Sequence, residues 1–384
     1  MELTQTKTNP NTKEAMTIPH QNLQNFINQL NDVFINRKAE IHILATALIA
    51  EENAVLVGLH GTSKSLLVDA FSKALNGRFF QYQLSKFTTP DELFGHFSLK
   101  EIKDNDEYIR KYQNKLPDAN VAFMDECFKA SSALQNSLLT ILNERAIDLG
   151  NGTRQKTDLQ MIVGASNEYP FDDSSLLALW DRWLFRRHVG RLKKSRDVWR
   201  VMTDPNLGKC SASLSMDDIN EIRKLRDQVS IEPIKDLIMS IHAYTKEKDI
   251  DVSGRRWRKI AKIIRSRAAM DGRSAATPKD LRILSEVLWN RPEQRDELTA
   301  FLSGLCSGDL KAAMSIYDKL KSMIENTNMD SISEISRTNQ QAKTLVEQLA
   351  DLDDSDPEVL SYQEKCHALS DGFIRAYTRT VHGG

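Results

Sequence analysis

The sequence has few cysteines, no long apolar run and no excess of charge of either sign. Its four cysteines stand far apart with no CxxC pair, which argues against a zinc knuckle or a disulfide framework. The N-terminus has no apolar signal-peptide core, and no stretch approaches the ~20 apolar residues that cross a bilayer. Lysine and arginine (52) nearly balance aspartate and glutamate (53), so nucleic acid is an unlikely partner, although a local basic stripe stays possible. We expect a soluble, cytoplasmic protein in a reducing environment, without a membrane segment.

The rest of the composition is that of an ordinary globular chain. With 384 residues, 40% of them apolar and 27% charged, it is long enough for two or three domains. Residues 1–18 have almost no large apolar side chains to offset the entropy of ordering, so they are expected to form a disordered arm. We expect an α/β core at 19–193, an all-helical domain at 194–291 and a helical extension at 292–384.

Short apolar runs alternate with helix-length segments in the first half of the chain. The runs are typical of strands and lie at NAVLVG (53–58), FFQYQL (79–84), NVAFMDE (120–126) and LQMIVGASN (159–167). Apolar residues at helical spacing precede the first run and recur at about 64–76 and 130–143. Strands separated by helices predict a parallel sheet of the doubly wound kind.

Beyond about Lys193 the strand signals end. Ser215 precedes two nearby aspartates and Thr277 precedes Pro278, and both patterns are typical helix starts. The second domain is therefore predicted to be helical. From Pro292 the helical pattern is more polar and is broken by the acidic run at 351–358, which predicts a helical hairpin.

The segment GLHGTSKS (58–65) lies between the first predicted strand and a predicted helix. Its glycines allow backbone N–H groups to surround a polyphosphate while the positive end of the helix faces it. Lys64 would reach the β and γ phosphates, and Ser65 would ligate Mg²⁺. Ser63 replaces the last glycine of the G-x-x-x-x-G-K-[ST] pattern, and a side chain is tolerated there only if the residue keeps a negative φ. The alternative is a glycine-bearing turn before an amphipathic helix.

Two further predicted strands end in polar residues. Asp125 and Glu126 end one of them and Asn167 ends another, and a doubly wound sheet places its site beyond the carboxyl ends of its strands. Asp125 would then face the magnesium shell, Glu126 would polarise the attacking water, and Asn167 would orient that water. The alternative is ordinary chemistry of solvated strand ends and turns. Cys127 is interpreted as a small core residue rather than a nucleophile, because no histidine is near it in the sequence.

These motifs lie in long stretches that resemble the MoxR family of AAA+ ATPases, and within it the RavA-like branch. The stretches fall within about residues 20–290 and are FTTPDELFGHFSL (87–99), VAFMDECFKASSALQNSLLTILNER (121–145), VGASNEYPFDDSSLLALWDRWLFR (163–186) and SGRRWRKIAKIIRSRAAMDGRSAATPKDL (253–281). The resemblance implies an α/β AAA+ core with a helical lid, ATP and Mg²⁺ as cofactors, and ATP hydrolysis with Glu126 and Asn167 as catalytic residues. The residues that it implies at the nucleotide are Gly58, His60, Gly61, Thr62, Ser63, Lys64, Ser65, Leu66 and Asp125, of which Ser65 and Asp125 would hold Mg²⁺.

The resemblance also gives roles to arginines. Arg182 in the DRW motif looks like the catalytic arginine finger that enters a neighbouring subunit's site, with Arg186 as the second choice. Arg255, in preference to Arg256, looks like the sensor 2 residue of the lid at the nucleotide. Without the resemblance, surface ion pairing would be the favoured interpretation.

The same resemblance implies a ring, expected to be hexameric, that remodels a protein client, often with a partner bearing a von Willebrand factor A domain. It places two insertions near the pore of the ring, one from FTTPDELFG to about 116 and one hairpin at 146–159 that turns at Asn151-Gly152. It does not extend to the tail after Pro292. Two alternatives stay open: a nucleotide-controlled scaffold with vestigial hydrolysis, which Ser63 favours, and a DNA-acting motor, which the charge balance disfavours.

Overall fold

The computed structural model describes residues 17–382, except 150–151, 307, 328–330, 351 and 353–356. The chain forms two compact units, residues 1–292 and 293–384. The expected disordered arm lies outside the described residues apart from its last two, and Ile18 is already the first residue of a helix.

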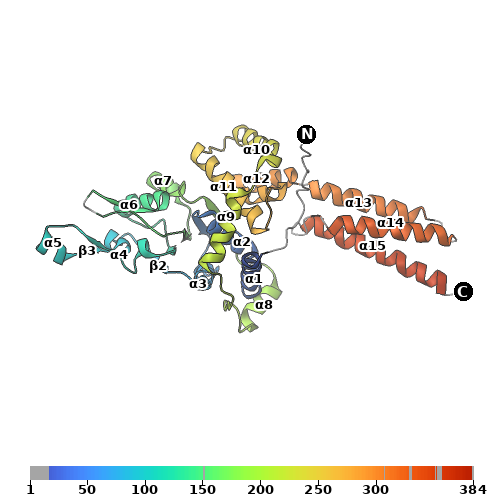
Figure 1. Ribbon diagram of the computed structural model, residues 1–384, viewed down its shortest axis with the longest axis horizontal. Coiled ribbons are helices and arrows are strands. Elements are labelled where there is room, and N and C mark those ends of the chain that lie inside the picture. Colours follow the sequence, from blue (N-terminus) through green and yellow to red (C-terminus); the bar gives the residue numbers. More distant parts are fainter. Residues whose placement is uncertain are drawn as a thin grey trace, which may run out of the picture. The chain divides into compact units, whose positions relative to one another are not determined.

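A five-stranded sheet forms the centre of the first unit (Figure 1). Its strands are all parallel, in the order β2-β5-β8-β1-β9. They are β1 (Ala54–Val57), β2 (Phe79–Gln83), β5 (Val121–Asp125), β8 (Met161–Ser166) and β9 (Phe185–His188). The first four confirm the predicted strands. Every residue of β1 and β8 is buried, as a sheet covered on both faces requires.

Helices of the core precede and connect these strands. They are α1 (Ile18–Val33), α2 (Lys38–Ala50), α3 (Lys64–Lys73), α6 (Ser132–Glu144) and α7 (Leu177–Trp180). α3 packs against β5 and β8, and α2 packs against β1 and β9. Because the strands are parallel, their carboxyl ends, including the exits of β1, β5 and β8, share one edge of the sheet.

Two insertions leave the core and contact each other. The first contains α4 (Pro90–Phe94), β3 (His96–Phe97), α5 (Leu99–Asn105) and β4 (Arg110–Lys111), and it projects away from the sheet (Figure 1). The second is the expected antiparallel hairpin of β6 (Ala146–Asp148) and β7 (Arg154–Lys156); Asn151 of its predicted turn lies outside the described residues. The Gln155 side chain donates to the Tyr112 hydroxyl at 2.6 Å, so the two insertions meet.

A helical part of the first unit follows α8 (Ser195–Thr203), and it is called the lid from here on. It consists of α9 (Met216–Gln228), α10 (Lys235–Glu247), α11 (Gly254–Met270) and the 3-10 helix η5 (Pro278–Glu286). Both predicted starts are capping boxes, Ser215 with Asp218 and Thr277 with Asp280. α9 packs on α1 and α2, and α11 packs on α2.

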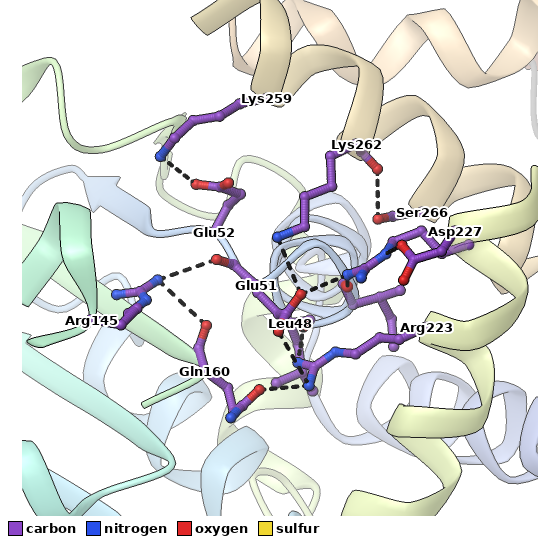
Figure 2. Close-up of polar contacts among 12 residues, drawn as sticks. Leu48, Glu51, Glu52, Arg145, Gln160, Arg223, Asp227, Lys259, Lys262 and Ser266 are labelled. Atoms are coloured by element: carbon purple, nitrogen blue, oxygen red, sulfur yellow. Dashed lines mark hydrogen bonds and ion pairs between the residues drawn. The ribbon is translucent and has the colours of Figure 1, made fainter. Parts of the chain in front are cut away.

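A polar network joins the lid to the C-terminal end of α2 (Figure 2). Arg223 and Arg226 of α9 donate to the carbonyls of Leu48 and Ile49, each at 2.6 Å, and so satisfy acceptors that a helix end leaves unpaired. The Glu51 carboxylate pairs with Arg226 at 2.8 Å and with Lys262 at 3.1 Å. These contacts dock the lid beside the start of β1, at the edge opposite the carboxyl ends.

The second unit is helical, with α12 (Glu293–Leu305), α13 (Gly308–Glu325), α14 (Ile332–Ala350) and α15 (Pro357–His382). The last three pack on one another around Ala313, Leu320, Leu349 and Cys366. The predicted hairpin of two helices was therefore incomplete: four helices follow Pro292 in the described part of the chain, and the last three of them form a hydrophobic core. Among the described residues, no helix is both long and apolar enough to cross a bilayer.

Candidate functional site

The loop between β1 and α3 lies at the carboxyl edge of the sheet. The Gly58 N–H donates to the Ser166 carbonyl at 3.0 Å, and a Cβ at Gly58 would come within 2.3 Å of the Val189 oxygen, so only glycine fits. Gly61 has φ +76°. Within the loop the Thr62 hydroxyl donates to the Leu59 carbonyl at 2.9 Å. These contacts form the loop ahead of the N-terminus of α3, where a helix attracts anions.

Ser63 lies in the left-handed region, with φ 63° and ψ 22°. The expectation of a negative φ was wrong: the loop keeps the conformation that favours glycine although the residue carries a Cβ. Such a conformation costs a non-glycine residue about 1–2 kcal/mol. His60, Gly61 and Ser63 are exposed, as is Leu66 in the first turn of α3.

Lys64, the first residue of α3, is buried under the loop. Its Nζ donates to the carbonyls of Gly58 and Leu59, at 2.5 and 3.0 Å, and to Asn167 Oδ1 at 3.1 Å. Burial lowers the pKa of Lys64, while the charges of Asp125 and Glu126 oppose that shift. The cation that would meet the phosphates thus already lies between the loop and the end of β8.

The acids lie next to the loop. The Ser65 hydroxyl donates to Asp125 Oδ2 at 3.2 Å. Hydroxyl and carboxylate oxygens suit a hard cation such as Mg²⁺. No group of three or more His, Cys, Asp or Glu side chains placed to hold a metal occurs among the described residues.

Glu126 follows β5 in the left-handed region, with φ 53°. This turn directs its buried carboxylate toward the end of β8, where Oε1 accepts a hydrogen bond from the Asn167 amide. Its other oxygen lies 3.2 Å from Lys129 Nζ. Lys64, Ser65, Asp125, Glu126 and Asn167 therefore form one connected group, from three different strand ends.

Cys127 does not belong to this group. It is 1% exposed, and its sulfur would lie 2.9 Å from a Cβ at Gly164, inside the sheet packing. Burial raises the pKa of its thiol well above the usual range, which makes it a poor nucleophile.

Arg37, between α1 and α2, is a site residue that sequence reasoning missed. Its buried guanidinium donates to the Thr62 carbonyl at 2.9 Å and to the Gly190 carbonyl at 3.0 Å. It thereby ties the loop to the segment that leads from β9 to the lid. No motif marks this arginine in the sequence, because its partners are backbone carbonyls distant along the chain.

Arg182 lies at the other edge of the sheet. Its carbonyl accepts from the Asn53 side chain at 3.5 Å, and Asn53 precedes β1 whereas the loop follows it. At about 3.3 Å per residue, the five steps from Asn53 to Gly58 span roughly 16 Å. The side chain is 22% exposed, with Nη1 3.3 Å from Asp181 Oδ2. The structure does not bring Arg182 to the loop of its own chain.

The other candidate arginines also lie away from the loop. Arg186 is fully buried and donates to the carbonyls of Trp183 and Trp180, at 2.9 and 3.2 Å, so this second choice has no free guanidinium to offer a neighbour. Arg255 is exposed, and its nearest polar contact is a long one of 3.5 Å to Asn143 near the end of α6.

Comparison with known proteins shows the family to which the chain belongs. A family model described as "MoxR domain in the MoxR-vWA-beta-propeller ternary systems" matches residues 21–224, and one described as "AAA lid domain" matches residues 233–302. The chain belongs to the MoxR family of AAA+ ATPases. An uncharacterized protein of Methanocaldococcus jannaschii is 34% identical over 314 residues, which span 81% of this chain and 83% of the relative.

A more distant relative and a solved structure are also similar to this chain. A protein named chaperone MoxR1 of Mycobacterium tuberculosis is 21% identical over 189 residues, 47% of this chain and 48% of the relative. The crystal structure of a putative ATPase from Cytophaga hutchinsonii shares the fold, with a TM-score of 0.58 at 19% identity, over 75% of this chain and 94% of the other.

Proposed function

We propose that this MoxR-family protein hydrolyses ATP as a subunit of a ring, with six subunits expected. The observation that carries the proposal is the separation of its parts: Lys64 and Glu126 lie at one edge of the sheet and Arg182 at the other. A head-to-tail contact between two copies would bring one copy's arginine to the next copy's loop, and repeating such a contact closes a ring or extends a filament.

Each site residue has a proposed role in ATP hydrolysis that follows from its position. Lys64 would hold the terminal phosphates, and Ser65 with Asp125 would hold Mg²⁺, which neutralises charge on the transferring phosphoryl group. Glu126 would accept a proton from the attacking water, and its hydrogen bond from Asn167 would orient both groups. Arg182 of the neighbouring copy would stabilise the transition state, and we propose that Arg255, which lies far from its own loop, also faces a neighbour's nucleotide.

The partner follows from the family. The matching family model names systems of MoxR, vWA and β-propeller proteins, and on that description we propose a von Willebrand factor A domain protein as partner of a chaperone-like remodelling reaction. The contact between Tyr112 and Gln155 joins the two insertions into one surface that would face the client. The DRW and SGRRW stretches support the RavA-like branch, and the free cysteines support the reducing cytoplasm.

A nucleotide-controlled scaffold with little hydrolysis is the second candidate. The strained φ of Ser63 is the observation that favours it. Steady-state phosphate release separates the two functions: an enzyme turns over ATP, whereas a scaffold assembles with ATP and releases little phosphate.

Mixed mutants test the shared site. Arg182→Ala should bind ATP normally and hydrolyse it on the order of 10³-fold more slowly, and wild-type activity per subunit should rise with protein concentration as rings assemble. An Arg182→Ala subunit has an intact loop and a Glu126→Gln subunit has an intact arginine. A mixture more active than the mean of the two variants supports the shared site, and absence of both the gain and the concentration dependence would refute it.

A further inference from the structure

Asp181 links Arg182 to the lid of the same subunit. One carboxylate oxygen, Oδ1, accepts from Arg256 Nη2 at 2.6 Å, and the other, Oδ2, lies 3.3 Å from Arg182 Nη1. Arg256 therefore has the shorter contact with the carboxylate that both arginines share. The stronger contact comes from the lid, and the weaker one from the arginine that would serve a neighbour.

Arg256 is held firmly in this position. It lies in the first turn of α11, its side chain is 5% exposed, and its other terminal nitrogen donates to Asn290 Oδ1 at 2.7 Å. Asn290 also accepts from the buried Arg186 at 3.0 Å and donates to the Asp251 carbonyl at 2.7 Å. Arg256 is thus held in place by its helix, α11, and by its bond to Asn290.

Arg182 is held loosely by comparison. Its contacts with Asp181 and with the Ala178 carbonyl are both 3.3 Å, whereas those of Arg256 with Asp181 and Asn290 are 2.6 and 2.7 Å. A carboxylate that is free on both oxygens binds one guanidinium through two parallel hydrogen bonds, which is stronger than a single contact. Arg256 weakens such pairing, because its short bond to Oδ1 already satisfies part of the negative charge of the carboxylate and its own positive charge repels a second guanidinium.

We propose that Arg256 is a positioning residue that competes with Arg182 for Asp181, and that the lid of one subunit thereby controls the arginine offered to the next. With the lid docked, Arg182 keeps one weak contact and is free to reach a phosphate. When Arg256 withdraws, Asp181 pairs fully with Arg182 and retains it in its own subunit. This inference rests on the proposed function, because it presumes that Arg182 acts on a neighbour's site.

The test uses Arg256→Gln in the full-length protein. Misplacement of a group that must reach the reacting atoms costs up to about 10²-fold in rate, so kcat should fall about 10- to 100-fold while ATP affinity stays within about twofold. Adding Asp181→Asn should release the arginine and restore at least about tenfold of the lost kcat. A merely structural role of the ion pair would leave the double variant no better than Arg256→Gln.

Mixing Arg256→Gln with other variants tests whether its loss of activity arises on the side of the subunit contact that offers the arginine. Arg256→Gln mixed with Glu126→Gln should gain activity above the mean, whereas Arg256→Gln mixed with Arg182→Ala should not, because both lack a usable arginine. Lys259→Gln is the matched control: it breaks another ion pair of α11 with the core, to Glu52 at 2.6 Å, and should keep kcat. If Arg256→Gln does not fold, Arg256→Met keeps the packing of the stem and serves in every arm.

The outcomes separate the two proposals. Wild-type kcat in Arg256→Gln, absence of rescue by Asp181→Asn, or a mixing gain with Arg182→Ala each overturns the competition for Asp181. Full activity of Arg182→Ala, in contrast, overturns the shared site itself. An inactive Arg182→Ala together with a normal Arg256→Gln leaves the proposed function standing and removes this inference alone.

Discussion

Glu51→Gln should destabilise the docking of the lid while leaving the shape of the side chain unchanged. Glu51 ends α2 in the left-handed conformation, with φ 53°, and faces Arg223 and Lys262 of the lid (Figure 2). Its carboxylate also pairs with Arg226 at 2.8 Å. Burial alone would raise the pKa of Glu51, but these cations outweigh it and lower the pKa from 4.5 to about 2. The folded protein therefore stabilises the ionised carboxylate.

The size of the effect follows from this pKa. At about 1.4 kcal/mol per pH unit, the change from 4.5 to about 2 corresponds to about 3.4 kcal/mol as an upper limit. The Glu51 side chain is 35% exposed, and solvent screens ion pairs at such positions. Reducing the limit by about half leaves about 1.5–2 kcal/mol, which is a shift of several degrees in Tm for a unit of this size.

The pH dependence has a definite sign. Because the folded pKa of Glu51 is depressed, its contribution is present in full above the ordinary pKa of 4.5 and is lost as pH falls toward about 2. The difference in Tm between wild type and Glu51→Gln should thus be largest at neutral pH, shrink from about pH 5 downward and vanish near pH 2.

Thermal melts of both proteins between pH 7 and 2.5 provide the measurement. Glu144→Gln is the control, because its ion pair with Arg154 joins side chains that are 52% and 57% exposed and contributes at most about 1 kcal/mol. A Tm difference for Glu51→Gln that is no larger than that of the control, or that does not depend on pH, would show that the network does not hold the lid.

Three further predictions concern the loop and the acids. Lys64→Ala should weaken ATP binding in a direct titration, because it removes the cation placed between the loop and Asn167; wild-type affinity would contradict the role of the loop. Glu126→Gln should bind ATP and turn over at least ~100-fold more slowly, and an unchanged rate would place the general base elsewhere. Ser63→Gly should relieve the strain of φ 63° and keep or raise phosphate release, since glycine adopts this conformation freely; a fall in rate would mean that the Ser63 side chain contributes to the site.

The parts of the fold and site that could be predicted carry local signals. Three of the four apolar runs, at β1, β5 and β8, have nearly all of their strand residues buried in one sheet, whereas β2 is an edge strand of which only Phe80 is buried. The helix starts at Ser215 and Thr277 are capping boxes of neighbouring residues. Lys64 and Asp125 could be paired from the sequence because parallel strands end at one edge. That these two residues lie close together follows from the sheet topology and can be predicted without knowing the side-chain packing.

Other features depend on contacts between distant segments. β9 escaped prediction because its residues, FRRH, include three basic side chains; it is an edge strand that pairs with β1 on one side. Ser63 has a positive φ within a loop whose conformation depends on contacts with other segments. Arg37 contacts the loop through hydrogen bonds to the carbonyls of Thr62 and Gly190. Neither the φ of Ser63 nor the contacts of Arg37 can be predicted from the residues next to them in the sequence.

Family resemblance identifies the candidate arginines, but their burial and contacts in the structure distinguish between them. Two short runs, DRWLFR (181–186) and SGRRW (253–257), contain all four candidate arginines. The chain nevertheless buries Arg186 and Arg256 and leaves Arg182 and Arg255 with long contacts. A buried guanidinium stays where its carbonyl and carboxylate partners hold it, because breaking those bonds leaves an unpaired buried charge. A loosely held one can reorient toward a phosphate at small cost. We therefore base the proposed division between positioning and catalytic arginines on burial: the two loosely held arginines, Arg182 and Arg255, are those proposed to act on a neighbour's nucleotide.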